Sequence, residues 1–402
     1  MKKVVRQIVF NFFTHIAQLL PSWDEAQYVQ VFLPRLSLPV TLPVNYKMLP
    51  DSFAKKFVSI KSIRNRRIFL LSNVCVNGDA VVFKNLRIFN PSLTWLLDSY
   101  KYKKGKLLLK QWKSNSKTVQ KTQIVALAYD AWSAENYYHW MIESLPRLLI
   151  VKTQFPDCLL LVPKPAPEFI TTTIKLLGFL NIYELSRKEL EILKVANLVL
   201  PELVYYEEEE KIVEGLYKQQ ISGRLQVKQS LSEMTFDFGQ EELIVSVKKM
   251  LLESITNKLV LPSKKIFISR SRQKIRRLLN ENDVEAILDK HQFETVFFEG
   301  LPFLKQVDLM LNTSIFISIH GSNMVNILFL QAGSKVIELM NKDYLNDAYY
   351  LLASSIGVPY YSIPCTMADK TIKPNDDTVK INDADLLVDL QELEQVLNLA
   401  LA

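Results

Sequence analysis

The sequence is poor in the residues that build cross-links and metal sites. Its 402 residues include three cysteines, Cys75, Cys158 and Cys365, and four histidines. The cysteines lie far apart and form no CxxC pair, and no two histidines have the spacing of metal ligands. These absences argue against a disulfide-stapled secreted domain and against a zinc module, and they favour a reducing compartment.

Glycine is also scarce, with 10 residues, and the glycine-rich phosphate loops are missing. Neither GxGxxG nor GxxxxGK[ST] occurs, so neither a dinucleotide site nor a P-loop is predicted. The GxSxG elbow of serine hydrolases and any internal repeat are absent as well. What remains is an ordinary globular composition, 49% hydrophobic and 23% charged, in a chain long enough for two domains.

No apolar run is long enough to span a bilayer. The segment 1–23 begins with three basic residues, but polar residues interrupt its apolar stretch and no small-residue cleavage site follows. It predicts an amphipathic helix that either packs on the protein or lies on a membrane.

The net charge of +7 suits an anionic ligand or a membrane surface and is weak evidence for nucleic acid. We expect a cytoplasmic protein, with peripheral contact to the inner face of the membrane as the alternative.

The order of predicted strands and helices divides the chain into three parts. Residues 1–122 combine the N-terminal helix with short strands, residues 123–238 alternate strands and helices, and residues 239–402 repeat that alternation before a closing helix. The second and third parts each predict a doubly wound parallel sheet. The expected fold class is therefore α/β, with two Rossmann-like lobes, a cleft between them and an N-terminal β-rich region.

A basic loop, SRSRQKIRR at 269–277, directly follows a predicted strand at 265–269. Its arginines include Arg270, Arg272 and Arg276, and the planar guanidinium group suits the oxygens of a diphosphate. Ligands of parallel sheets bind at the carboxyl ends of strands, where this loop lies. The alternative is a solvated basic turn.

The stretch 315–340 predicts a βαβ unit. A strand at 315–319 ends at His320-Gly321, a helical pattern runs from Met324 to a C-cap at Gly333, and a second strand follows at 335–340. A helix N-terminus in this position favours anions. Glu338 in the second strand could reach a ribose hydroxyl, or it could be a core-edge carboxylate held by backbone amides.

A third candidate site lies in a predicted helix at 137–151. His139 and Glu143 are four residues apart and so share one helix face. Either could deprotonate an acceptor hydroxyl, and the aromatic neighbours could line a sugar or a base. The alternative is a structural histidine packed among aromatic residues.

Three segments together, YYHWMIESLPRL, SRSRQKIRRLLNE and ISIHGSNMVNILFLQAGSKVIEL, resemble glycosyltransferase family 61 over residues 124–363. The resemblance implies an inverting enzyme that uses sugar nucleotides, with a two-lobed, GT-B-like architecture. In such enzymes arginines and helix N-termini replace a metal at the diphosphate. The bacterial relatives are associated with capsular polysaccharide biosynthesis.

The family's motifs assign roles to matching positions of this chain. The donor-binding positions are Arg272 and Arg276, with Arg270 competing for the first arginine, and His320, Gly321, Ser322, Asn326 and Glu338. The acceptor-binding positions are Tyr138 and Trp140. The expected base is His139, with Glu143 as the alternative, and no residue is assigned to a metal. Asn323 and Met324 depart from the family's usual pattern.

These assignments predict an inverting, metal-independent glycosyltransferase. It would move a sugar from a UDP-sugar, its substrate rather than a cofactor, to a saccharide or lipid-linked saccharide of a surface or capsular polysaccharide. No nucleic-acid partner is expected in this interpretation. The alternatives are a non-catalytic protein that binds anions or nucleic acid, and a degenerate transferase that acts as a scaffold.

Overall fold

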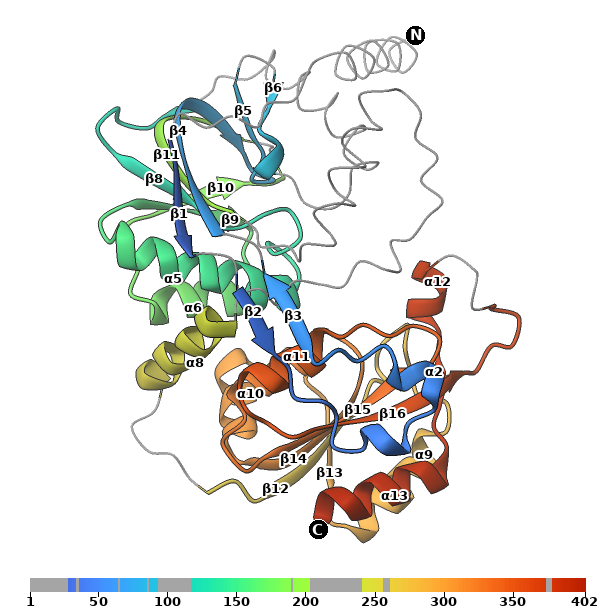
Figure 1. The fold of residues 1–402 in the computed structure, drawn as a ribbon. Coiled ribbons are helices and arrows are strands. Elements are labelled where there is room, and N and C mark those ends of the chain that lie inside the picture. Colours follow the sequence, from blue (N-terminus) through green and yellow to red (C-terminus); the bar gives the residue numbers. More distant parts are fainter. Residues whose placement is uncertain are drawn as a thin grey trace. The chain divides into compact units, whose positions relative to one another are not determined.

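The computed structural model describes residues 28–33, 36–63, 66–84, 87–92, 117–188, 191–202, 241–255, 261–373 and 378–402. The chain divides into two compact units, one formed by residues 1–34 and 65–203, the other by residues 35–64 and 204–402 (Figure 1). Both contain parallel strands and helices, which confirms the expected α/β class. The predicted N-terminal helix lies outside the described residues.

Unit 1 is built on a nine-stranded mixed sheet with the order β10-β9-β8-β11-β4-β5-β6, to which β1 adds at β4 and β7 at β11. The strands β8 to β11 pair in parallel, whereas β4 pairs antiparallel with β11. The strands of the region expected at 1–122 and those of the first expected lobe thus share one sheet. The bounds are β1 (Tyr28–Leu33), β4 (Arg66–Asn77), β5 (Val82–Lys84), β6 (Arg87–Ile88), β7 (Lys117–Thr118), β8 (Ile124–Leu127), β9 (Leu159–Lys164), β10 (Ile182–Ser186) and β11 (Ile192–Pro201).

The helical segment after β8 differs from the single α-helix expected at 137–151. It consists of α4 (Tyr137–His139), a π-helical turn η3 (Trp140–Ser144) and α5 (Leu145–Gln154). The next helix, α6 (Glu168–Leu176), receives a hydrogen bond of 2.8 Å from the indole Nε1 of Trp140 to Thr173 Oγ1. A short 3₁₀ turn, η2 (Asn90–Ser92), follows β6.

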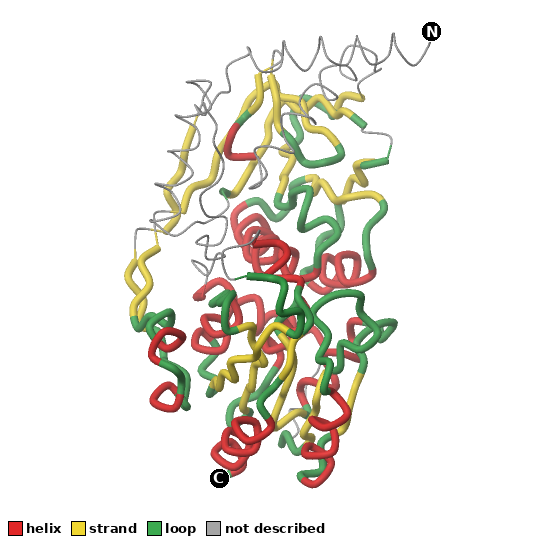
Figure 2. Tube along the Cα trace, turned by 90° about the vertical axis from the view of Figure 1, so that its right-hand side faces the viewer, coloured by secondary structure: helices red, strands yellow, loops and turns green. Residues whose placement is uncertain are grey.

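Unit 2 contains a six-stranded sheet with the order β13-β12-β14-β15-β16-β17, parallel throughout except for β17 (Figure 1, Figure 2). Its central strands β14 and β15 are almost continuously buried, as expected for a parallel sheet covered on both faces. The bounds are β12 (Lys264–Ile268), β13 (Glu294–Val296), β14 (Thr313–Ile319), β15 (Lys335–Asn341), β16 (Tyr360–Met367) and β17 (Leu386–Leu387).

Helices cover both faces of this sheet. One face packs its alternate residues, such as Ile317, Ile337 and Ile363, against the apolar sides of α9 and α13. The other face lies against α10, α11 and the 3₁₀ helix η5, with α8 packing on α11 and η5. The bounds are α8 (Glu241–Ile255), α9 (Glu281–Lys290), α10 (Phe303–Leu311), η5 (Ser322–Phe329), α11 (Ala348–Ser355), α12 (Thr378–Asp383) and α13 (Leu390–Leu401).

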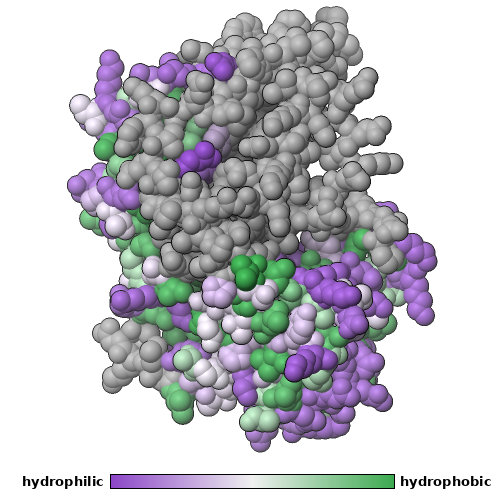
Figure 3. All heavy atoms as spheres, viewed as in Figure 1, coloured by the Kyte–Doolittle hydropathy of each residue, from purple (hydrophilic) through white to green (hydrophobic). Residues whose placement is uncertain are grey.

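Residues 35–64 belong to unit 2, although they precede most of unit 1 in the chain. β2 (Leu36–Pro39) pairs with β3 (Ile60–Ile63), and η1 (Tyr46–Met48) and α2 (Asp51–Ala54) lie between them. The side-chain amide of Asn45 forms two hydrogen bonds with the backbone of Ser362 in β16, of 2.7 and 3.1 Å. Figure 3 shows a mixed surface on the visible face of this unit, with apolar groups among hydrophilic ones.

Two helix assignments from the sequence change in the structure. The helix expected from Met324 to a C-cap at Gly333 is the 3₁₀ helix η5, which ends before the extended residue Leu330. Apolar residues three apart fit either helix type, so the pattern did not distinguish them. The closing helix, expected over residues 386–401, begins at Leu390, where the Asp389 carboxylate accepts hydrogen bonds from the first turn. Within the described ranges no helix is long and apolar enough to cross a membrane.

Candidate active site

The arginine loop and the His-Gly loop of unit 2 are neighbours because their strands pair. β12 pairs in parallel with β14, so the residues that follow each strand emerge at the same edge of the sheet. Arg270 is only 7% exposed and lies against the backbone of Gly321. A Cβ atom at position 321 would overlap Nη1 of that guanidinium. A side chain at position 321 would therefore push the end of Arg270 aside without straining the backbone, since the φ of 167° is an extended conformation that any residue adopts.

Arg276 brings a second guanidinium to this edge. Its backbone is left-handed, with φ 56°, and its Nη2 donates to Asp383 Oδ1 over 3.1 Å. Its Nε is buried and has no hydrogen-bond partner in the described part of the chain. Burial, together with the positive charge of Arg276, lowers the pKa of Arg270. An anion at this place would satisfy the buried donor and offset the repulsion between the two cations.

His320 is held by a chain of buried hydrogen bonds. Its Nδ1 lies 2.5 Å from Glu338 Oε1, and the hydroxyl of Tyr360 donates to Glu338 Oε2 over 2.6 Å. The Tyr349 ring lies 5.0 Å from the imidazole. Because Nδ1 bonds the carboxylate, Nε2 remains for a ligand, and it has no hydrogen-bond partner among the described residues.

Glu338 itself is 0% exposed, and both of its oxygens are engaged by side chains. This arrangement is neither a carboxylate open to a ribose nor one held by backbone amides. Glu338 therefore acts on the loop through His320.

The remaining predicted donor residues lie around this group. The Arg272 guanidinium lies 3.7 Å from the centroid of the Phe297 ring, which follows β13 on the far side of β12 from β14. Ser322 starts η5 and is half-buried. Asn326 is buried, and its Nδ2 donates to Asn323 O and to Gln306 Oε1 on α10. The structure thus brings together Arg270, Arg276, His320 and Gly321, and it places Arg272 toward β13.

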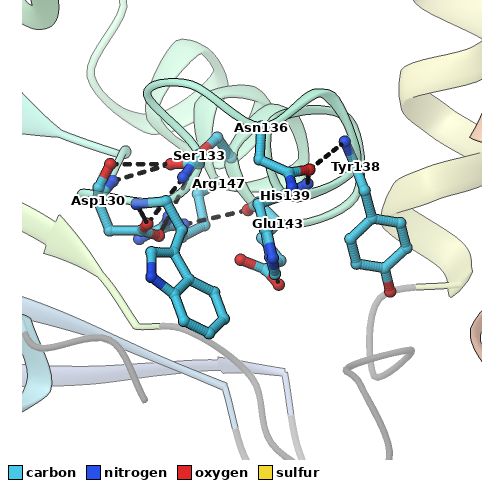
Figure 4. Close-up of polar contacts among 9 residues, drawn as sticks. Asp130, Ser133, Asn136, Tyr138, His139, Glu143 and Arg147 are labelled. Atoms are coloured by element: carbon cyan, nitrogen blue, oxygen red, sulfur yellow. Dashed lines mark hydrogen bonds and ion pairs between the residues drawn. The ribbon is translucent and has the colours of Figure 1, made fainter. Parts of the chain in front are cut away.

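The second cluster lies in unit 1, on α4 and η3 (Figure 4). Asn136 caps α4 by accepting a hydrogen bond of 2.9 Å from Tyr138 N. One turn later, His139 Nδ1 lies 2.6 Å from Glu143 Oε1, as the four-residue spacing predicted. The imidazole packs against the Trp132 ring, with 4.9 Å between centroids.

A buried ion pair lies behind this histidine and carboxylate. Arg147 donates from Nη2 to Asp130 Oδ2 over 3.2 Å and from Nε to the backbone oxygen of Glu143 over 3.1 Å. Burial by itself lowers the pKa of His139, but the carboxylates of Glu143 and Asp130 outweigh it, so the pKa is raised above 6.5. The carboxylates of Glu143 and Asp130 thus stabilise the protonated form of this imidazole.

The two predicted acceptor residues differ in position. Tyr138 is buried, with its ring edge-on to His139 at 5.2 Å. Trp140 is 1% exposed and bonds Thr173, so in this structure it packs η3 onto α6 and offers no surface to an acceptor.

Sequence reasoning missed several partners of these clusters. Arg147 follows Glu143 by four residues, so the same spacing rule could have found it. Asp130 comes shortly after β8, at a strand's carboxyl end. No local signal links Arg276 to Asp383, which is 107 residues away.

The sequence Asp383-Ala384-Asp385 places two carboxylates two residues apart, and such carboxylates could in principle bind a metal. In the structure Asp383 pairs with Arg276, and Asp385 pairs with Arg277 over 2.6 Å. Across the described ranges, no three His, Cys, Asp or Glu side chains gather as metal ligands would. That the reaction needs no metal stays a prediction.

A family model built from known proteins matches a part of the chain that contains residues of both clusters. The family model described as glycosyltransferase 61 matches residues 137–337, half of the chain, and this range includes His139, the arginine loop and the His320 loop. The chain therefore belongs to glycosyltransferase family 61.

One relative is the EGF domain-specific O-linked N-acetylglucosamine transferase of Drosophila melanogaster. The two sequences are 38% identical over 105 residues, which cover 25% of this chain and 20% of the relative. The similarity thus spans about one fifth of the Drosophila protein.

Proposed function

We propose that this chain is an inverting, GT-B-like, metal-independent glycosyltransferase. It moves a sugar from a UDP-sugar to a saccharide or lipid-linked saccharide acceptor. The observation that carries the proposal is the meeting of Arg270, Arg276 and the His320-Gly321 loop at the carboxyl edge of a parallel sheet. Two guanidinium groups and an imidazole are the donors that a diphosphate leaving group needs.

On the donor side, transfer breaks the bond between the anomeric carbon and the diphosphate, and the bonding electrons pass to the diphosphate oxygen. Arg270 and Arg276 stabilise that charge, and the buried, unpaired Nε of Arg276 is one of the donors. His320, held at Nδ1 by Glu338, presents Nε2 to the same group. Of the two competing alignments for the first arginine, the geometry favours Arg270 over Arg272.

On the acceptor side, His139 takes the proton of the acceptor hydroxyl, and the freed oxygen attacks the anomeric carbon from the face opposite the leaving group. Glu143 and Asp130 stabilise the imidazolium that forms, as the raised pKa of His139 indicates. Glu143 remains the alternative base.

Metal independence is proposed because arginines supply the positive charge, and because Asp383 and Asp385 already pair with arginines. Transfer should therefore persist in excess chelator. Loss of transfer in chelator, restored by manganese, would contradict this part of the proposal.

The proposed acceptor belongs to a surface or capsular polysaccharide, assembled in the cytoplasm with peripheral contact to the membrane. The Drosophila relative is named for transfer of N-acetylglucosamine, so UDP-N-acetylglucosamine is the first donor to test.

A thermal-shift screen tests the donor site without knowledge of the acceptor. UDP and at least one UDP-sugar should raise the unfolding temperature of the wild-type protein. Failure of every uridine nucleotide to do so would remove the basis of the proposal. If UDP binds but neither hydrolysis nor transfer of any UDP-sugar is detected, the chain is a degenerate transferase. Steeply salt-dependent binding of DNA or RNA without a shift by UDP would favour the nucleic-acid alternative.

A further inference from the structure

Tyr360 is the third member of the hydrogen-bond chain that begins at His320. It lies on β16, next to β15, and its hydroxyl donates to Glu338 Oε2 over 2.6 Å. The other oxygen of that carboxylate lies 2.5 Å from His320 Nδ1. All three residues are buried, and Glu338 has no exposed surface. One buried carboxylate is thus shared between an imidazole and a phenol.

The phenol can act only as a donor in this arrangement. Burial, followed by the negative charge of Glu338, raises the pKa of Tyr360 well above its usual value, so the hydroxyl keeps its proton. A buried carboxylate that receives two hydrogen bonds is stabilised in its ionised form. Because the carboxylate accepts and cannot donate, the imidazole must donate from Nδ1.

We propose that Tyr360 is a positioning residue for His320: by donating to Glu338 it holds the carboxylate in place, and the carboxylate fixes the imidazole with its proton on Nδ1. Nε2 is then the nitrogen that faces a ligand. When an anion binds, Nε2 takes a proton from the solvent and donates a hydrogen bond to the anion, while Nδ1–H keeps its hydrogen bond to Glu338. The identity of that anion as the donor diphosphate rests on the proposed function; the positioning does not.

The groups around His320 leave Glu338 as the partner of Nδ1. Arg270 touches Gly321 from the loop after β12, but a guanidinium has no acceptor for the Nδ1 proton. Tyr349 on α11 lies tilted against the ring and stays neutral, because burial raises its pKa. Without the Tyr360 hydroxyl, Glu338 Oε2 loses its side-chain hydrogen bond, and the carboxylate is no longer held in place beside Nδ1.

Histidine-selective ¹⁵N NMR tests this inference in the full chain without nucleotide. The protein has four histidines, and His320→Gln assigns the signal. In the wild type at high pH, His320 should be the Nδ1–H tautomer. In Tyr360→Phe a signal of the Nε2–H tautomer should appear as well, because the carboxylate has lost the hydrogen bond that positions it.

Tyr361→Phe is the matched control. It makes the same chemical change on the next residue of β16, whose side chain packs in the core on the other face of the sheet. It should leave the Nδ1–H tautomer of His320 unchanged. Retention of the Nδ1–H tautomer alone in Tyr360→Phe, or an equal loss of it in Tyr361→Phe, overturns the proposal. An Nε2–H tautomer in the wild type also overturns it, whether or not Tyr360→Phe folds.

Calorimetric titration with UDP separates this inference from the proposed function. UDP should bind Tyr360→Phe more weakly than Tyr361→Phe, because the imidazole is no longer fixed in one tautomer. If the wild type does not bind UDP at all, the proposed function fails, and the NMR result still decides the role of Tyr360.

Discussion

At the scale of single residues, Gly321→Ala should weaken UDP binding while leaving the stability of the protein almost unchanged. Alanine fits its extended backbone, and the obstructing atom is the end of the flexible Arg270 side chain. Gly321→Ala should therefore leave the free energy of unfolding within about 1 kcal/mol of the wild type. It should weaken UDP binding by about 1.5–3 kcal/mol, the value of a charged hydrogen bond, because Arg270 must move.

Gly333→Ala is the converse control. Gly333 has open space around it but a φ of 87°, so a side chain there is strained by about 1–2 kcal/mol. It should lower the urea midpoint and leave UDP affinity intact. If Gly321→Ala binds UDP as the wild type does, Arg270 is not a ligand.

His139 gives a prediction about pH. Its pKa is raised in the folded state, so its contribution to stability is present below about pH 6.5 and is lost as pH rises through the folded pKa. As a base it must be neutral, so kcat/KM should rise with pH through that same pKa.

Glu143→Gln removes the nearer carboxylate, and burial then acts against the charged imidazole. The acidic limb of the kcat/KM profile should move to lower pH in this variant. A limb that stays in place would show that His139 is not the group that titrates. Complete loss of activity at every pH would favour Glu143 as the base.

At the scale of elements, the π-helical turn η3 shapes the acceptor-side cluster. Arg147 on α5 binds the backbone oxygen of Glu143 in this turn and also pairs with the buried Asp130. Arg147→Met should destabilise the protein by about 3–5 kcal/mol, because it leaves a buried carboxylate without its partner. Urea unfolding measures the effect.

The exposed pair between Lys164 and Glu184 serves as the control for that variant. Glu184→Gln should cost no more than about 1 kcal/mol, as surface ion pairs usually do. Equal losses in the two variants would mean that the Arg147 pair contributes nothing beyond an ordinary surface contact.

Much of the element order could be predicted from the sequence, because short apolar runs and helical periodicity are local signals. The strands predicted at 315–319 and 335–340 lie within a residue or two of β14 and β15. The π turn at Trp140 and the 3₁₀ geometry of η5 could not be predicted, since both keep an apolar spacing that an α-helix also has.

The candidate site was predictable in its motifs but not in its pairings. Charge alone makes Arg270 and Arg272 equivalent, and only the pairing of β12 with β14 on one side and β13 on the other separates them. The partners Tyr360 and Asp383 come from distant segments, so no local pattern revealed them.

At the scale of the whole molecule, unit 2 is assembled from two distant parts of the chain. Asn45 binds both backbone groups of Ser362, 317 residues away, on the strand that carries Tyr360. Asn45→Ala should leave these buried groups unpaired, at a cost of about 1–3 kcal/mol. Hydrogen exchange of β16 should become faster.

Asn197→Ala tests whether that effect is particular to unit 2. Asn197 in unit 1 binds the backbone oxygen of Lys121 at an exposed site, so its loss should leave β16 protected. Faster exchange of β16 in both variants would indicate general destabilisation of the protein, and not a local effect of the hydrogen bonds between Asn45 and Ser362.

The most direct test of the donor site is calorimetric titration of UDP into four proteins: the wild type and the alanine variants of Arg270, Arg276 and Arg272. The account predicts that the wild type binds. Arg270→Ala and Arg276→Ala should each weaken binding by about 1.5–3 kcal/mol, or roughly 10- to 150-fold, whereas Arg272→Ala stays close to the wild type. Equal affinity in all four proteins would contradict the assignment of the arginine loop to the donor diphosphate.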